Sequence, residues 1–292
     1  MGLQTGGVEG TVVTFAGGSL REDARVIFSA EIAGEWLIIT DRSPFHPVSL
    51  SWPDQPGDRG WMLCGSERLR VLESREALLH SATGVLSVGD EARALKRADP
   101  GLTSVVLHVT EAPPSTTTVT LEVDAPFRAA LSRQHTGVHL AALALNNVAS
   151  GFWTKDPQDP DGLGAPNLDK SAVTRSEIGL EASLDHYRLG KSLRKKGFEA
   201  AGFLSDLPAR GAAMNAVLRE MLATPAVVRI TPAEGPLADR RLWTTRLNGT
   251  DVKMPCGGTH LADLAELAKV TVSLTATEDG FSMQTSSTLQ RS

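Results

Sequence analysis

Two short motifs hold the residue types that could bind a metal ion. The motif HTGVH places His135 and His139 four residues apart, and the motif CGGTH does the same for Cys256 and His260. On a helix, side chains four residues apart lie one turn apart on the same face. Three imidazoles and one thiolate are a good tetrahedral set of zinc ligands. If the two motifs meet in the fold, they form a zinc site.

Each motif alone is weak evidence, because an HxxxH pair occurs by chance on many helices. The chain has only seven histidines and two cysteines, and four of these nine residues fall in the two matched spacings. The presence of both motifs therefore favours a metal site over chance. Of the other histidines, His46 and His80 are expected to be ordinary loop or surface residues.

The two motifs also resemble a known signature. HTGVH followed by CGGTH is similar to the HxxxH…CxxxH signature of the editing domain of alanyl-tRNA synthetase, whose freestanding relatives are the AlaX trans-editing proteins. Threonyl-tRNA synthetases carry a related domain. The segment Asp251–His260 resembles the family pattern G-x-D-x-x-x-C-G-G-T-H. The resemblance implies an AlaX-type freestanding editing protein that binds Zn2+. The implied metal ligands are His135, His139, Cys256 and His260.

The N-terminal part continues the resemblance less closely. The family carries a segment like D-x-T-x-F-Y-P-E-G-G-G-Q-P-x-D-x-G. The matching positions are Asp41, Phe45, Pro47, Gln55, Pro56, Asp58 and Gly60. The longer segment Val48–Asp54 replaces the Glu-Gly-Gly-Gly core. Because glycines let a backbone approach a ligand or a neighbouring domain closely, we expect this loop to be shaped differently. It either contacts the active site in another way or is a structural loop without a catalytic role.

The resemblance implies a metal-dependent aminoacyl-tRNA hydrolase that removes a wrong amino acid from tRNA. The family clears serine, and in part glycine, from the tRNA for alanine, so Ser-tRNA(Ala) and Gly-tRNA(Ala) are the first expected substrates. A site built to hydrogen-bond a hydroxyl rejects a substrate that lacks one. The altered loops keep open a second substrate class, a threonine-type residue such as a halogenated threonine. A third hypothesis is a non-catalytic zinc-containing module that binds tRNA or an amino acid.

The sequence leaves the chemistry of the site open between two arrangements. Zinc with a free coordination position lowers the pKa of a bound water to near 7 and polarises a carbonyl. Four protein ligands instead fill a tetrahedral zinc, as in structural sites, unless one of them, for example Cys256, is displaced. If all four protein ligands bind the zinc, the attacking water is activated by Thr136, by Thr259, by neighbouring backbone or by a ribose hydroxyl of the substrate.

The resemblance also suggests residues of an amino-acid pocket. In the editing family, the strand after the HxxxH helix carries small hydroxyl or amide side chains that line this pocket. By position, Thr174 and Ser176 are the candidates on that strand. Gly258, in the CGGTH motif, is the third candidate for substrate binding.

One dense group of basic residues stands out in this acidic chain. The stretch Asp185–Lys196 is expected to be helical, with Arg188, Lys191 and Lys195 on one face. The candidates for contacts with the phosphates at the acceptor end of an aminoacyl-tRNA are Arg188, Lys191, Arg194, Lys195 and Lys196. The alternative is a solvated helix face, as charge runs usually are.

The N-terminal half is expected to be rich in strands. From residue 8 to about residue 123, short apolar runs broken by Gly, Pro and Asp predict a small β-barrel. The expected strands are Val8–Phe15, Ala24–Ile32, Trp36–Thr40, Arg68–Glu73, Val105–Thr110 and Pro114–Val123. A long helix should then begin at Asp124, because Asp can cap a helix and Pro126 suits its first turn, and end near residues 146–151.

The C-terminal half should mix strands and helices around that central helix. Residues 152–170 form a long loop rich in Pro, Gly and Asp, either an insertion near the mouth of the site or a plain surface excursion. Strands are expected at Ser171–Ile178, Leu180–Leu184, Ala226–Thr231, Arg241–Leu247, Val270–Ala276 and Phe281–Ser286, and a helix at Ala209–Ala223. We therefore expect an α+β protein. A β-barrel domain occupies residues 1–123, and an editing domain with an antiparallel sheet packed on helices occupies residues 124–292.

The composition is that of an ordinary globular protein. With 292 residues, 41% of them hydrophobic, the chain is long enough for two domains. The net charge of −5 argues against a general nucleic-acid binder but allows one local basic patch. We expect no membrane span and no signal peptide, and the two cysteines suggest a cytoplasmic protein without a disulfide framework. No Gly-rich phosphate loop suggests ATP binding, and the oligomeric state stays open.

Overall fold

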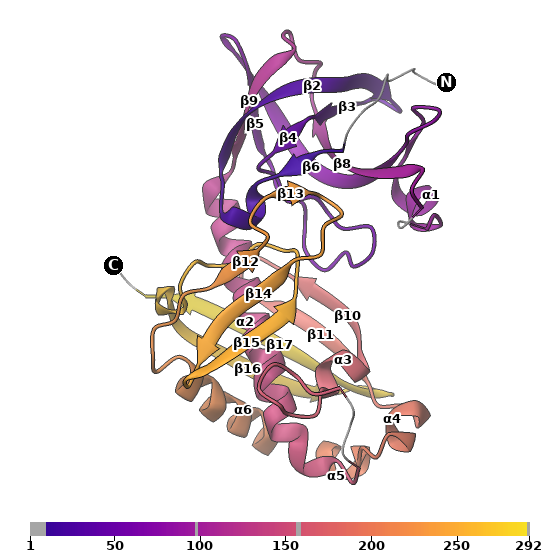
Figure 1. Ribbon diagram of the computed structural model, residues 1–292. Coiled ribbons are helices and arrows are strands. Elements are labelled where there is room, and N and C mark those ends of the chain that lie inside the picture. The colour runs from indigo at the N-terminus through magenta and orange to yellow at the C-terminus, as the bar shows by residue number, and fades with distance from the viewer. Residues whose placement is uncertain (1–9, 97–98, 156–158, 291–292) are drawn as a thin grey trace. The chain divides into compact units, whose positions relative to one another are not determined.

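The computed structural model describes residues 10–96, 99–155 and 159–290, which form two compact units (Figure 1). Among these residues, unit 1 contains those up to residue 128 together with residues 230–241 and 257–259. Unit 2 contains the described residues of 129–229, 242–256 and 260–290. In the described part of the chain, no helix combines the length and the apolar character that crossing a membrane would need.

Unit 1 is built on an antiparallel sheet with the strand order β5-β9-β2-β3-β8-β6-β7. Strands β5 and β6 pair with each other as well. The strands are β2 (Arg21–Ile32), β3 (Glu35–Thr40), β5 (Gly60–Cys64), β6 (Glu67–His80), β7 (Leu86–Ser87), β8 (Leu102–Thr110) and β9 (Thr118–Val123). The short helix α1 (Gly89–Arg93) follows β7.

The core of unit 1 follows from alternation along these strands. In β5, Met62 and Cys64 are buried while Trp61 and Leu63 are half-buried, as expected for a strand with one face in a core. The same core contains Ile38, Phe45 and Leu121. A small second sheet, ordered β13-β1-β4, joins β1 (Val12–Val13) to β4 (Arg42–Ser43) and to β13 (Gly235–Pro236).

Unit 2 is organised around the long helix α2 (Ala125–Ala149), which begins in unit 1. Asp124 caps this helix, since its Oδ1 accepts a hydrogen bond from the backbone N–H of Phe127 at 3.2 Å. In unit 2, α2 runs between an antiparallel sheet ordered β10-β11-β17-β16 and the hairpin β14–β15 (Figure 1). These strands are β10 (Val173–Ile178), β11 (Ser183–Arg188), β14 (Leu242–Leu247), β15 (Thr250–Pro255), β16 (Leu267–Ala276) and β17 (Gly280–Leu289).

The described residues of unit 2 also form the α-helices α3 (Leu168–Ala172), α4 (Lys191–Lys195), α5 (Ala200–Leu204) and α6 (Leu207–Met221). The short strand β12 (Arg229–Thr231) begins at Arg229 in unit 2 and ends in unit 1. Helix α6 covers the edge strand β16. The side-chain amide of Asn215 donates to the carbonyl of Val272 at 2.9 Å and accepts from its N–H at 2.8 Å, so it pairs backbone groups that an edge strand leaves open.

The structure confirms the α+β class and the antiparallel sheets, and it places the central helix where the sequence predicts it. The helix expected over Asp185–Lys196 is wrong in its first part, because Ser183–Arg188 form strand β11 and α4 begins only at Lys191. Strand β5 was not expected. The barrel and the domain boundary at residues 123 and 124 stay predictions.

Candidate metal centre

Helix α2 supplies two histidines on one face of unit 2. His135 and His139 are 5% and 8% exposed, and their ring centroids are 5.0 Å apart in an edge-on arrangement. The four-residue spacing predicted by the sequence therefore brings both imidazoles into the same buried region.

The hairpin β14–β15 delivers the third ligand. Its strands are joined by Asn248-Gly249, whose φ angles are 49° and 83°. Positive φ at both positions is the geometry of a two-residue hairpin turn, which Asn-Gly favours. Because β15 ends at Pro255, the next residue, Cys256, leaves the hairpin at a fixed position.

His260 is held by the chain that follows it. Asp263 and Glu266 form a capping box at the start of a short 3-10 helix (Leu264–Glu266), in which the side chain of each accepts a backbone N–H of the same turn. The backbone N–H of Val228 also donates to the carbonyl of Ala262 at 2.8 Å. The segment after the CGGTH motif is therefore fixed close to the fourth ligand.

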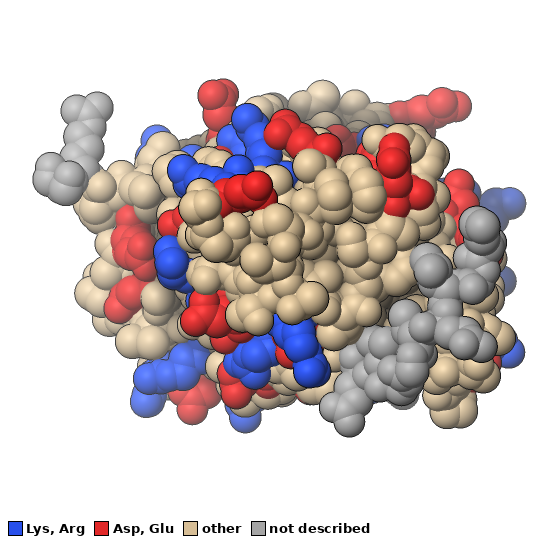
Figure 2. Space-filling view, turned by 90° about the horizontal axis from the view of Figure 1, so that it is seen from above, with Lys and Arg blue, Asp and Glu red and all other residues tan. Residues whose placement is uncertain are grey.

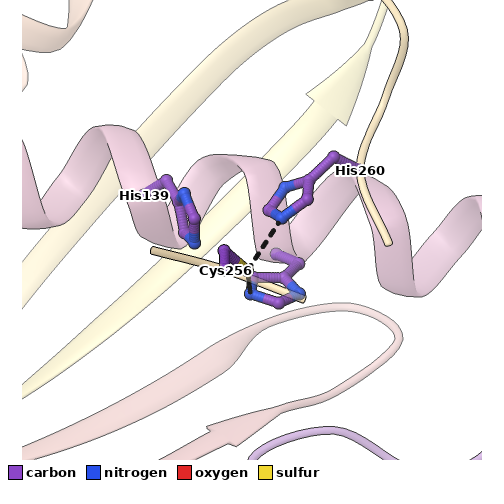
Figure 3. A group of neighbouring side chains, drawn as sticks. His139, Cys256 and His260 are labelled. Carbon is purple, nitrogen blue, oxygen red and sulfur yellow. Dashed lines mark hydrogen bonds between the residues drawn. The ribbon is translucent and has the colours of Figure 1, made fainter. Parts of the chain in front are cut away.

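These elements bring the four predicted ligands together. Figure 3 shows the side chains of His139, Cys256 and His260 turned toward one another. One ligand atom from each of the three residues and from His135 lies within 4.8 Å of all the others. Cys256 Sγ lies 3.5 Å from His135 Nε2 and 3.2 Å from His260 Nε2.

The donor set and its spacing fit a zinc ion. Tetrahedral zinc with ordinary bond lengths separates two ligand nitrogens by about 3.3 Å, and a nitrogen from a sulfur by about 3.6 Å. The two sulfur–nitrogen distances, 3.5 and 3.2 Å, are close to this value. Burial, and to a lesser degree the charge of His135, lowers the pKa of His139 well below its usual value, so this imidazole is neutral and able to ligate. The cluster could therefore hold a metal ion.

A further observation on His139 agrees with this reading. Its Nδ1 is buried and has no hydrogen-bond partner among the described residues. Metal-binding imidazoles normally use one nitrogen for the metal and the other for a hydrogen bond. A metal ion would give the buried ring of His139 an interaction partner that the described protein atoms do not provide.

Trp243 is a neighbour of the cluster that sequence reasoning missed. It is fully buried, and its ring centroid lies 5.0 Å from that of His139 and 6.1 Å from that of His260. Its Nε1 is also buried without a hydrogen-bond partner among the described residues. The sequence assigned Arg241–Leu247 to a strand without a role for its tryptophan. A large aromatic residue on the first strand of the hairpin that leads to Cys256 was the available signal.

Thr136, predicted as a candidate to activate water, lies inside unit 2 and is fully buried. Its Oγ1 lies 2.8 Å from the carbonyl oxygen of Ser132, 3.1 Å from the backbone nitrogen of Leu261 and 3.3 Å from Nδ1 of His260. The hydroxyl thus connects α2 to the segment that carries the fourth ligand.

The other two residues predicted from the CGGTH motif, Gly258 and Thr259, are buried and belong to unit 1. Within that unit, Gln55 Nε2 donates to Thr259 Oγ1 at 3.3 Å. The same Nε2 lies 3.5 Å from His46 Nδ1. His46 was expected to be an ordinary loop or surface residue; it lies in a loop, but it is buried. Burial, and secondly the charge of Arg128, lowers the pKa of His46 to about 3.

A buried ion pair in unit 1 was also missed. The guanidinium of Arg128 binds the carboxylate of Asp58 and donates to the carbonyl of Pro44 at 2.7 Å. The side chains of Arg128 and Asp58 are 6% and 0% exposed. Asp58 lies on the pattern that resembles the editing family, but no feature of the sequence pointed to its partner. The pair ties the first turn of α2 to the loop before β5.

The predicted pocket and phosphate-binding residues occupy other parts of unit 2. Thr174 and Ser176 lie on the edge strand β10, where Thr174 is exposed and donates to the carbonyl of His186 at 3.1 Å, while Ser176 is half-buried. The exposed basic residues lie at the end of β11 and around α4. They are Arg188, Lys191, Arg194, Lys195 and Lys196. Arg188 is on a strand, so the predicted common helix face does not include it.

The long loop after α2 is fastened to the helix by one amide. Asn146 Nδ2 donates to Asp161 at 3.1 Å and to Asn167 at 3.2 Å, and its Oδ1 accepts from the N–H of Asp169 at 2.9 Å. Asn146 follows His139 by seven residues and therefore shares its face of the helix. A Cβ at Gly162 would lie 2.6 Å from a methyl of Val252, so this loop also lies against β15. The described part of the loop is thus anchored in unit 2.

Comparisons with known proteins agree in part with the sequence prediction. No protein-family model matches the chain. The chain is 30% identical over 267 residues to the alanine–tRNA ligase of Chlorobaculum tepidum. The match covers 89% of the chain and 26% of the ligase, so the chain spans about a quarter of that relative's length. The similarity supports the predicted relationship to alanyl-tRNA synthetase.

Proposed function

We propose that this protein is a metal-dependent hydrolase of mischarged aminoacyl-tRNA. The observation that carries the proposal is the convergence of His135 and His139 with Cys256 and His260, within 4.8 Å of one another, from two distant parts of the chain. The similarity to a tRNA ligase supports tRNA as the substrate. The proposal includes action in trans, on tRNA charged by a separate synthetase.

The residues of the cluster would hold zinc, because one thiolate and three imidazoles suit that ion. Zinc, when bound, supplies a Lewis acid that polarises a carbonyl and makes a water more acidic. Trp243 keeps solvent away from the side of the cluster formed by His139 and His260, which strengthens electrostatic interactions there. Thr259 and Gly258 are proposed to lie close to the acyl group, and Thr174 and Ser176 to contribute to the amino-acid pocket.

The proposed domains are a β-barrel over residues 1–123 and an editing domain over residues 124–292. The barrel is supported by the pairing of β5 with both β9 and β6, because this pairing returns the hydrogen-bonded sheet to its starting strand. The editing domain is supported by the antiparallel sheet and the hairpin on either side of α2.

The phosphates of the tRNA acceptor end are proposed to meet the basic residues around α4. All five are exposed, whereas Leu193 between them is buried and fixes the helix to the unit. A net charge of −5 favours a small local contact region over a large basic surface. On another face, the one seen from above in Figure 2, the described Lys and Arg side chains lie among Asp and Glu side chains and form no broad basic surface.

Serine on the tRNA for alanine is the first proposed substrate, with glycine as a second. A threonine-type residue, including a halogenated threonine, is the alternative. The segment Val48–Asp54 and the loop fastened by Asn146 differ from the family pattern or from its usual length, which supports a changed substrate choice.

A second function, a non-catalytic zinc-containing module that binds tRNA or an amino acid, is favoured by one observation. The four protein ligands are enough to fill a tetrahedral zinc, which is the mark of a structural site. In that case zinc would stabilise the fold, and its removal would unfold unit 2.

A deacylation panel tests the proposal. Purified protein is incubated with Ser-, Gly-, Ala- and Thr-charged tRNAs, and zinc is assayed on the same sample. His135→Ala should abolish both turnover and stoichiometric zinc. His186→Ala is the matched control, because this half-buried histidine of unit 2 lies on β11 outside the cluster. Rapid loss of serine supports the first substrate, and loss of threonine alone supports the alternative. Stoichiometric zinc without turnover would leave the binding module as the better description.

A further inference from the structure

The hydroxyl of Thr136 is a junction between the two segments that carry the metal ligands. Thr136 lies on α2 between His135 and His139 and is fully buried. Its Oγ1 meets three polar groups, the carbonyl oxygen of Ser132, the backbone N–H of Leu261 and Nδ1 of His260. Two of these groups belong to the segment that follows Cys256, so one side chain connects both halves of the cluster.

The number of protons decides the direction of each hydrogen bond. A threonine hydroxyl has one proton to donate and two lone pairs to accept with. The carbonyl oxygen of Ser132, at 2.8 Å, can only accept, so the hydroxyl proton points there. The N–H of Leu261, at 3.1 Å, can only donate. The remaining lone pair faces His260 Nδ1 at 3.3 Å, and this nitrogen must therefore carry a proton.

The tautomer of His260 follows from this assignment. A neutral imidazole with its proton on Nδ1 has a free lone pair on Nε2. His260 Nε2 lies 3.2 Å from Cys256 Sγ, inside the cluster. The ring is thus turned so that its lone pair faces the other three ligands.

We propose that Thr136 is a positioning residue for the metal ligand His260, a role that rests on the proposed metal site. Its hydroxyl fixes the Nδ1–H tautomer and the orientation of the ring, and through Leu261 it also holds the backbone behind the ligand. Hydrogen bonds of this kind to a metal-binding histidine raise metal affinity. Because all three hydrogen-bonding positions of the hydroxyl are occupied, it has none left to activate a water, and the positioning role replaces the one predicted from the sequence.

Zinc affinity of two variants tests the inference. Thr136→Val keeps the shape of the side chain and removes the hydroxyl, whereas Thr136→Ser keeps the hydroxyl and serves as the matched control. Competition with a chromophoric chelator should show roughly 10- to 100-fold weaker zinc binding for Thr136→Val, and binding within about threefold of the wild type for Thr136→Ser. The visible spectrum of the Co2+-loaded protein should change for the valine variant only. Wild-type affinity and an unchanged spectrum in a folded Thr136→Val protein would overturn the inference.

The tautomer can be read without any substitution. A long-range 1H–15N correlation spectrum of the zinc-loaded wild-type protein should show a protonated Nδ1 and a metal-bound Nε2 for His260. A metal-bound Nδ1 would overturn the inference even if the valine variant failed to fold. If the wild-type protein bound no zinc, the proposed function would fail as well. If the wild type bound zinc and Thr136→Val bound it equally well, only the role of Thr136 would fail.

Discussion

Gly137 is a position where a single methyl group should reveal how closely the ligand-bearing helix approaches the sheet. It lies on α2 between His135 and His139, two of the candidate metal ligands. A Cβ at this position would lie 1.9 Å from Ser287 Oγ, 3.2 Å from Ser287 Cβ and 3.6 Å from a methyl of Val270. The first distance is far below van der Waals contact, so Gly137→Ala cannot be accommodated unless Ser287 or the helix moves.

Two opposing effects set the size of the result. Replacing glycine by alanine inside a helix stabilises it by about 1 kcal/mol. Overpacking a well-packed interior costs about 1 to 3 kcal/mol. We therefore expect Gly137→Ala to lower the free energy of unfolding by about 1 kcal/mol, against the direction of helix propensity.

Ser287→Ala isolates the steric term. Ser287 Oγ is buried without a hydrogen-bond partner among the described residues, so its removal should cost little. In the Ser287→Ala background the shortest contact is gone, and Gly137→Ala should be neutral or stabilising by up to about 1 kcal/mol. Urea unfolding of the four metal-free proteins gives the coupling energy, expected at about 1 to 2 kcal/mol. A coupling below about 0.5 kcal/mol, or a stabilised Gly137→Ala single variant, would refute the close approach of α2 and β17.

Three further predictions concern the ion pair, acid and metal. Asp58→Asn should lower the free energy of unfolding by about 3 to 5 kcal/mol, because it leaves the buried guanidinium of Arg128 without its carboxylate. A loss below about 1 kcal/mol, measured by urea unfolding, would contradict this prediction. Burial lowers the pKa of His108 to about 4. Below about pH 6.5 the unfolded chain therefore binds more protons than the folded one. The free energy of unfolding should fall by about 3 kcal/mol from pH 6.5 to pH 4. His108→Gln should flatten this pH dependence in metal-free protein by about one proton, and an unchanged slope would count against the buried neutral ring. Zinc at 100 times its Kd should stabilise the protein by about 2.7 kcal/mol in thermal unfolding, and His135→Ala should remove that gain; an equal gain in the variant would speak against the cluster.

The cluster of candidate metal ligands was predictable because the geometry within each motif is local. His135 and His139 needed only a helix, and α2 has the cap and the apolar residues that specify one. Cys256 follows an Asn-Gly hairpin, which is also a local signal. The meeting of the two motifs was inferred from the choice of residue types, and the structure brings the four side chains together.

The misread strand β11 shows where local patterns mislead. Its buried face carries Ser183, Asp185 and Tyr187, so the expected alternation of apolar and polar residues is absent. The basic residues beyond it recur at a helical spacing, and this spacing suggested one helix from Asp185 onward. Tertiary contacts decided the outcome, since Tyr187 donates a hydrogen bond to Asp169 on α3 at 2.7 Å and its ring stacks on Phe281 of β17. Such contacts of a polar buried face cannot be read from the sequence pattern.

The polar network of unit 1 could not be predicted for a related reason. Arg128 and Asp58 are ordinary charged residues in the sequence, and only the fold buries them against each other. The same holds for Trp243, whose role depends on which rings lie beside it. Periodicity identifies faces of elements, whereas these contacts depend on which faces meet.

Unit 1 is assembled from parts of the chain that are far apart in the sequence, and this limits the order in which the chain can fold during synthesis. Strand β1 pairs with β13, with Val12 opposite Pro236, and Gln55 hydrogen-bonds Thr259. The ribosome makes both distant partners only after most of unit 2 has been synthesised. Although its sheet lies at the start of the chain, unit 1 can therefore be completed only after residue 259 has been synthesised. Until then the nascent protein carries an open strand edge at β1, which is the stage at which pairing with another chain would compete most strongly.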